Sequence, residues 1–97
     1  MPRKLAPIHP GTYLRETLHE LALSARQLAD TTPRRLSLVL LRGQRPVSAD
    51  LALRLERGLG QSASYWVNLQ AQYDLDTASD AADVALKRIG RLEQTHG

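Results

Sequence analysis

Four arginines and no acidic residue lie between positions 31 and 49 of this chain, around a six-residue run that is almost wholly apolar. A guanidinium group can donate two hydrogen bonds at once to a phosphate or to the edge of a guanine. The chemistry favoured by this segment is binding of a polyanion, with a solvated charged face as the alternative. The arginines are Arg34, Arg35, Arg42 and Arg45.

The remaining composition narrows the class of protein. The chain has 97 residues, a length that fits a single domain with a modest core. Its net charge is +3. It has no cysteine, so we expect a reducing cytoplasm and no thiolate metal site. We expect neither a signal peptide nor a membrane span. No catalytic triad, phosphate loop or metal-ligand spacing can be assembled, so we expect no enzyme, cofactor or metal.

Helix start and stop signals place the arginines on an all-α scaffold of five to six helices. His9 and Pro10 open a first helix, whose apolar stripe is Leu14, Leu18 and Leu21. The capping box from Ser24 to Gln27 opens a second helix of about two turns. The later helices are expected from Thr32-Pro33 to Gly43, from Ser48 to Gly60, from Ser62 or Ser64, and from near Asp76.

The apolar run is thus a helix rather than a strand, because Thr-Pro-Arg-Arg is a helix opening. A short helix, a tight turn and an arginine-rich third helix together indicate a helix-turn-helix of the Cro or phage-repressor type. At about 100° per residue, Arg35, Leu38 and Arg42 point outward whether the buried arc centres on Leu36 and Leu40 or on Leu40 and Leu41.

That outer face predicts a DNA-reading surface. Two arginines could read guanine edges in a major groove, and the leucine between them could contact a thymine methyl. Hydroxyls and free backbone N–H groups at the starts of helices two and three suit phosphate oxygens. The expected DNA contacts are Arg34, Arg35, Ser37, Leu38, Arg42, Gln44, Arg45, Ser24, Thr31 and Thr32.

The second half of the chain is expected to complete the core and to form a dimer. We assign residues 8–60 to the helix-turn-helix core and 62–95 to dimerisation within one domain. Trp66 is expected to seal the fifth helix onto the body. The acidic residues from Asp74 to Asp83 lack EF-hand spacing and are expected to be caps and solvated charges. The expected core and dimer residues are Trp66, Leu69, Tyr73, Ile89 and Leu92.

Three motifs in this order resemble those of the HigA-type antitoxins, from the VapI/HigA-like branch of the Cro-type helix-turn-helix family. They are "IHPGTYLRETL", "GQRPVSADLALRLERGLG" and "SASYWVNLQAQYDL", and the match runs from Ile8 to Leu75, about seven tenths of the chain. The resemblance implies a dimeric repressor that binds its own operator. It also implies neutralisation of a HigB-type, RelE-like toxin that cleaves messenger RNA. The recognition helix of the family corresponds to Pro33 through Arg42.

Two functions therefore remain open at the level of sequence. The four arginines favour an antitoxin that is also a DNA-binding repressor. Leu38, Val39 and the short turn after Ala29 favour an antitoxin or adaptor whose helix-turn-helix no longer reads DNA. For toxin contact, the hypothesis is the N-terminal segment 1–11 and the outer faces of helices one and two.

Overall fold

Six helices and no strand make up the residues that the structure, a computed structural model, describes. These are residues 6–92, without the side chain of Arg34. The all-α prediction is confirmed, and within residues 6–92 no helix is long and apolar enough to cross a membrane. The helices are α1 (Pro10–Glu20), α2 (Ala25–Leu28), α3 (Arg34–Leu41), α4 (Ala49–Leu59), α5 (Ala63–Ala81) and α6 (Asp83–Lys87).

Most of the helices begin at the caps that the sequence predicts. His9, Ser24, Ser48 and Ser62 each accept a backbone N–H of the first turn that follows them. Gly60 ends α4 in the left-handed conformation with φ of 88°. Helix α3 differs, because its N-cap is Pro33 and no side chain caps its first turn. Its first N–H groups therefore remain open to an outside acceptor.

A single hydrophobic core joins helices α1 to α5. Trp66 on α5 is fully buried, which confirms its predicted role in sealing that helix onto the body. Leu69 packs against the same core. The prediction that Leu21 completes the apolar stripe of α1 is wrong, because Leu21 is the C-cap of that helix and is 48% exposed. The buried apolar residues are Leu14, Leu18, Leu28, Leu40, Val47, Leu51, Ala52, Leu55 and Trp66.

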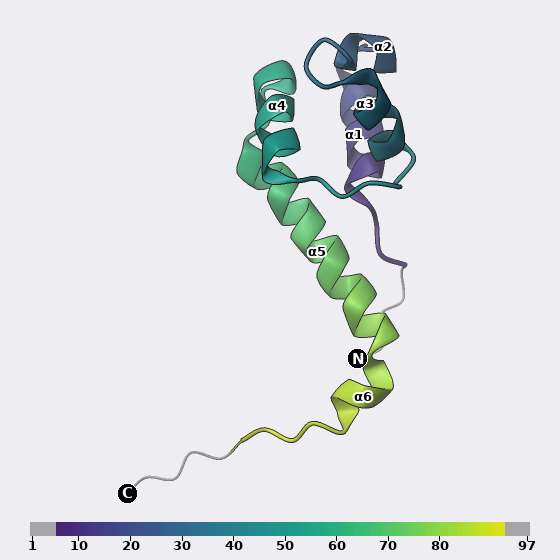
Figure 1. Cartoon of the computed structure of the whole chain (residues 1–97), viewed down its shortest axis with the longest axis vertical. Coiled ribbons are helices and arrows are strands. Elements are labelled where there is room, and N and C mark those ends of the chain that lie inside the picture. Colours follow the sequence, from purple (N-terminus) through teal and green to yellow (C-terminus); the bar gives the residue numbers. More distant parts are fainter. Residues whose placement is uncertain (1–5, 93–97) are drawn as a thin grey trace, which may run out of the picture.

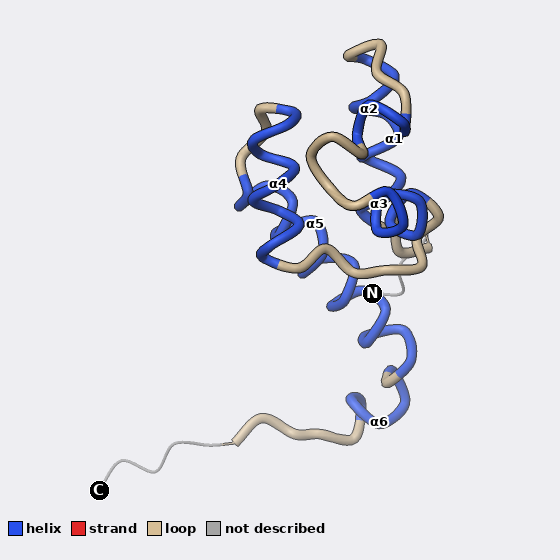
Figure 2. Tube along the Cα trace, turned by 45° about the horizontal axis from the view of Figure 1, so that its top comes forward, coloured by secondary structure: helices blue, strands red, loops and turns tan. Residues whose placement is uncertain are grey.

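Helix α1 approaches α3 closely because Gly11 has no side chain. A Cβ at this position would overlap the carbonyl oxygen of Leu40. Helix α3 packs against α1 and α2, and the loop of residues 29–33 between α2 and α3 swings out toward α4. The loop after α3 runs past α5 to reach α4 (Figure 2). This arrangement is the expected helix-turn-helix, carried on α1, α4 and the first half of α5.

The far half of α5 extends away from this body and leads into α6 (Figure 1). The prediction of a sixth helix starting near Asp76 is wrong, because α5 continues to Ala81. No glycine or proline interrupts residues 63–89, so nothing in the sequence forces a break at Asp76. Ile89 and Leu92 were expected in the core or at a dimer interface, but within one chain they are 71% and 89% exposed.

Candidate nucleic-acid interface

The outer face of α3 carries the side chains that the helical wheel predicts. Ser37 and Leu40 are each 1% exposed and point into the body. Arg35, Leu38 and Arg42 are exposed, with Leu38 at 38%. The structure therefore places two guanidinium groups on either side of one apolar side chain. Of Arg34 only the backbone belongs to the described part of the chain.

Two of the expected DNA contacts are wrong as far as their side chains are concerned. The hydroxyls of Thr32 and Ser37 are buried and hydrogen-bonded to each other. Ser37 Oγ also donates to the carbonyl of Pro33 at 3.3 Å. The short turn brings Thr32 under α3, where the pair satisfies each other's polar groups. These hydroxyls hold α3 against the turn and do not face a ligand.

Thr31 in the turn and Ser24 at the start of α2 also form hydrogen bonds within the chain. Thr31 is half-buried, and its Oγ1 donates to the carbonyl of Leu28 at 2.9 Å. Its methyl group packs against Gly58, where a Cβ would overlap it. Ser24 is exposed and forms the predicted capping box with Gln27, so its hydroxyl accepts a backbone N–H of α2.

Gln44 and Arg45 follow α3 on an exposed loop, next to the arginine face. Gly43 turns the chain there with φ of 73°, which a residue with a side chain adopts at a cost. Within the described residues, Arg35, Arg42 and Arg45 form no ion pair, so all three charges are available to a ligand. The loop and the helix thus offer one positively charged surface.

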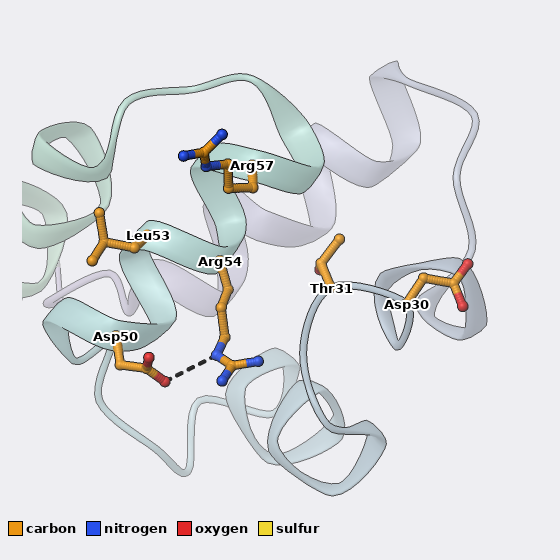
Figure 3. A pocket seen from close by; sticks show the side chains of 6 residues that line it. All are labelled: Asp30, Thr31, Asp50, Leu53, Arg54 and Arg57. Carbon is orange, nitrogen blue, oxygen red and sulfur yellow. Dashed lines mark hydrogen bonds and ion pairs between the residues drawn. The ribbon is translucent and has the colours of Figure 1, made fainter.

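A groove lies between the α2–α3 turn and α4 (Figure 3), but its charge is balanced. Asp50 and Arg54 form an ion pair there at 3.0 Å, and both are largely exposed. With Asp30 and Arg57 also present, the groove holds two carboxylates and two guanidinium groups. It lacks the uniform positive charge that a nucleic acid requires.

Gln70 and Asp74 on α5 hold the loop after α3 in place, and the sequence did not predict this role. Gln70 on α5 is 7% exposed, and its Oε1 accepts the backbone N–H of Val47 at 2.8 Å. Its Nε2 donates to Asp74 Oδ1 at 2.9 Å. Both residues fall in the "NLQAQYDL" motif, whose polar positions therefore have a structural use. Only the three-dimensional fold reveals it, because Val47 and Gln70 lie 23 residues apart.

His9 occupies a half-buried position between α1, this loop and α5. Its Nδ1 accepts the N–H of Gly11 at 2.9 Å, as the cap prediction requires. Its ring meets that of Tyr73 edge-on, with centroids 5.0 Å apart and an angle of 72°. Burial lowers the pKa of His9, while a hydrogen bond with the Arg45 backbone and the negative charge of Asp74 oppose the shift.

We therefore expect the stability of this fold to fall in mild acid through His9. A histidine whose folded pKa is lowered binds its proton more tightly in the unfolded chain, so stability rises with pH between the two values. The contribution should be complete above about pH 6.5 and should decline as the pH falls through the folded pKa. Protonation would also turn Nδ1 into a donor and break the Gly11 hydrogen bond.

Urea unfolding at a series of pH values measures this effect. His9→Asn keeps a cap acceptor but cannot titrate, so its unfolding free energy should depend less on pH than that of the wild type. The exposed His19 is common to both proteins and cancels in the comparison. Equal pH dependence of the two proteins would contradict the assignment.

Known proteins are similar to this chain in sequence and in fold. Virulence-associated protein I of Dichelobacter nodosus is 43% identical over 79 residues, which cover 77% of this chain and 72% of that protein. A solved antidote protein of the HigA family from Coxiella burnetii is 36% identical with a TM-score of 0.83, covering 91% of this chain and all of that one. The chain belongs to the HigA family of antitoxins.

A second HigA antitoxin was solved together with promoter DNA. The Pseudomonas aeruginosa antitoxin HigA, solved with the higBA promoter, is 40% identical with a TM-score of 0.82. The match covers 90% of this chain and 99% of that one. No protein-family model matches the chain. The resemblance to HigA antitoxins that the motifs indicate is thereby confirmed along nearly the whole chain.

Proposed function

We propose that this chain is a DNA-binding antitoxin that represses its own operon and neutralises a HigB-type, RelE-like toxin. The observation that carries the proposal is the outer face of α3, where Arg35 and Arg42 flank Leu38 in a stretch, residues 31–49, that contains no acidic residue. The family supports it, because the Pseudomonas aeruginosa HigA was solved with a promoter. The proposed role involves binding alone and no catalysis, and operator DNA as a ligand implies a cytoplasmic protein.

We assign base contacts and backbone contacts to different residues according to where their side chains lie. Arg35, Leu38 and Arg42 enter the major groove, where guanidinium groups read guanine and the leucine contacts thymine methyls. Gln44 and Arg45 lie on the loop beside them and hold the sugar-phosphate backbone. The uncapped first turn of α3 adds backbone N–H groups that suit a phosphate oxygen.

The active form in this proposal is a symmetric homodimer. Two copies of α3 are needed to read two half-sites about 34 Å apart. The far half of α5, helix α6 and the segment that follows it leave large apolar side chains exposed, which a second copy could cover. These side chains are Leu75 (65% exposed), Val84 (67%), Leu86 (48%), Ile89 (71%) and Leu92 (89%).

We assign toxin binding to the outer faces of α1 and α2, which leaves α3 free for DNA. Glu16 and Glu20 on α1 are exposed and suit a basic ribonuclease, and Leu21 adds an exposed apolar side chain beside them. Of the N-terminal segment in this hypothesis, residues 1–5 lie outside the described part of the chain.

The second candidate is an antitoxin or adaptor without DNA reading. One observation favours it: Leu38 is exposed at the centre of the α3 surface, and Val39 beside it is only half-buried. Apolar side chains at such positions also suit a protein partner.

The deciding experiment titrates the purified full chain into its own upstream DNA and into random duplex at the same salt concentration. We expect affinity for the operator at least about a thousandfold higher than for random DNA. Sedimentation at micromolar concentration should give a dimer, and a toxin from the adjacent reading frame should co-purify. Toxin binding without any operator preference would exclude the repressor and support the second candidate.

A further inference from the structure

The loop from Gly43 to Val47 carries Arg45, and two elements outside the helix-turn-helix hold it. Gln70 on α5 accepts the N–H of Val47 at one end of the loop. At the other end, the ring of His9 lies against Gly43, where an added Cβ would come within 3.5 Å of the ring carbon Cγ. Between these two points, the His9 ring lies close enough to the Arg45 backbone for that backbone to raise the pKa of His9.

The two ring nitrogens of His9 face different parts of the chain, the start of α1 and the loop after α3. Because Nδ1 accepts the N–H of Gly11, the proton of the neutral ring lies on Nε2. That N–H is the group able to donate to the carbonyl of Arg45. The start of α1 and the backbone of Arg45 are thus connected through a single side chain.

The ring is itself held from a third side. Tyr73 on α5 packs edge-on against it, and Asp74 on the next residue of α5 lies close enough to act on its charge. A side chain fixed by α1, α5 and the loop has little freedom to move. An asparagine could replace the cap acceptor alone, because its Oδ1 corresponds to Nδ1, but it has no group in the place of Nε2.

We propose that His9 is a positioning residue for DNA binding: it fixes the backbone of Arg45 so that the Arg45 guanidinium meets a DNA phosphate. The inference rests on the proposed DNA-binding function and deepens it. It gives the histidine of the "HPG" motif a role beyond starting α1. Without the ring, the Gly43–Val47 loop keeps its Gln70 anchor but loses the contacts at Gly43 and Arg45.

The test is a double-mutant cycle with full-length His9→Asn, Arg45→Ala and the combined variant. The readout is affinity for operator and for random duplex against salt concentration. Losing one phosphate contact per protomer should lower the salt slope by about one, or by about two for a dimer. We expect His9→Asn to lower the slope as Arg45→Ala does, and the double variant to match Arg45→Ala alone.

The salt slope separates positioning from a general loss of stability. A smaller folded fraction weakens binding by the same factor at every salt concentration and leaves the slope unchanged. His19→Asn, the same substitution at an exposed position on α1, is the matched control and should bind as the wild type. A wild-type slope in His9→Asn, or a double variant whose loss is the product of the two single losses, would overturn the proposal.

The experiment distinguishes failure of the His9 proposal from failure of the proposed repressor function. Phosphate contacts do not depend on sequence, so the cycle can also be measured on random duplex. A wild type that binds random DNA but shows no operator preference would refute the repressor while leaving the result on His9 readable. A wild type that binds no DNA at all would refute both.

Discussion

Replacing Trp66 by alanine should cost about 3–5 kcal/mol of unfolding free energy, the largest effect of any single truncation in this fold. The indole is fully buried among leucines of the core and holds α5 against the rest of the body. Removing it leaves a cavity that the surrounding helices can fill only in part. The measurement is urea unfolding at fixed protein concentration, because dimer stability depends on concentration.

Trp66→Phe should cost much less than the alanine substitution. The indole N–H is buried and has no hydrogen-bond partner among the described residues, so phenylalanine removes an unsatisfied donor. That gain offsets part of the lost volume. Val67→Ala, at the neighbouring position that is 39% exposed, is the control for the helix itself. A loss below about 1 kcal/mol in Trp66→Ala would show that α5 does not depend on this anchor.

Local signals in the sequence account for most of the fold. Caps act through neighbouring residues, so a histidine before Pro10, a Ser24–Gln27 box and a serine at position 48 suffice to place three helix starts. The end of α5 could not be placed in this way. Asp76 is a good cap but also sits within a helix, and only the uninterrupted chain around it decides between the two.

The DNA-binding face could be predicted because a helix has a fixed period. Arg35 and Arg42 point outward under either choice of buried arc, as the structure confirms. The prediction that Ser37 contacts DNA is wrong, although the arc between Leu40 and Leu41 already contains this residue. The helical wheel cannot show that Thr32 supplies a buried partner for it.

The contacts that hold the Gly43–Val47 loop could not be predicted from the sequence for a different reason. Gln70 and Val47 meet only because α4 and α5 pack side by side, and His9 meets Tyr73 across most of the chain. No periodicity links positions so far apart. The motif "NLQAQYDL" marks these residues through the family resemblance, but it does not say what they touch.

Removing the two arginines of the α3 face should have the largest effect on DNA binding. Arg35→Ala and Arg42→Ala should each cost about 1–3 kcal/mol of operator affinity per half-site and relax the preference at one base pair. Because they contact separate base pairs in the proposed complex, the combined variant should lose roughly 2–6 kcal/mol. Both side chains are exposed, so unfolding free energies should change by no more than about 0.5 kcal/mol.

Affinity for base-substituted operators at constant salt separates base reading from simple charge. Arg35→Lys keeps the charge but cannot donate two hydrogen bonds to one guanine edge. It should therefore keep most of the affinity for random DNA and still lose the preference for guanine. Leu38→Ala should weaken binding only to operators with thymine at the contacted position. If Arg35→Ala weakens operator and random duplex by the same factor, Arg35 contacts the backbone, and Arg42 and Leu38 must carry the specificity of the α3 face.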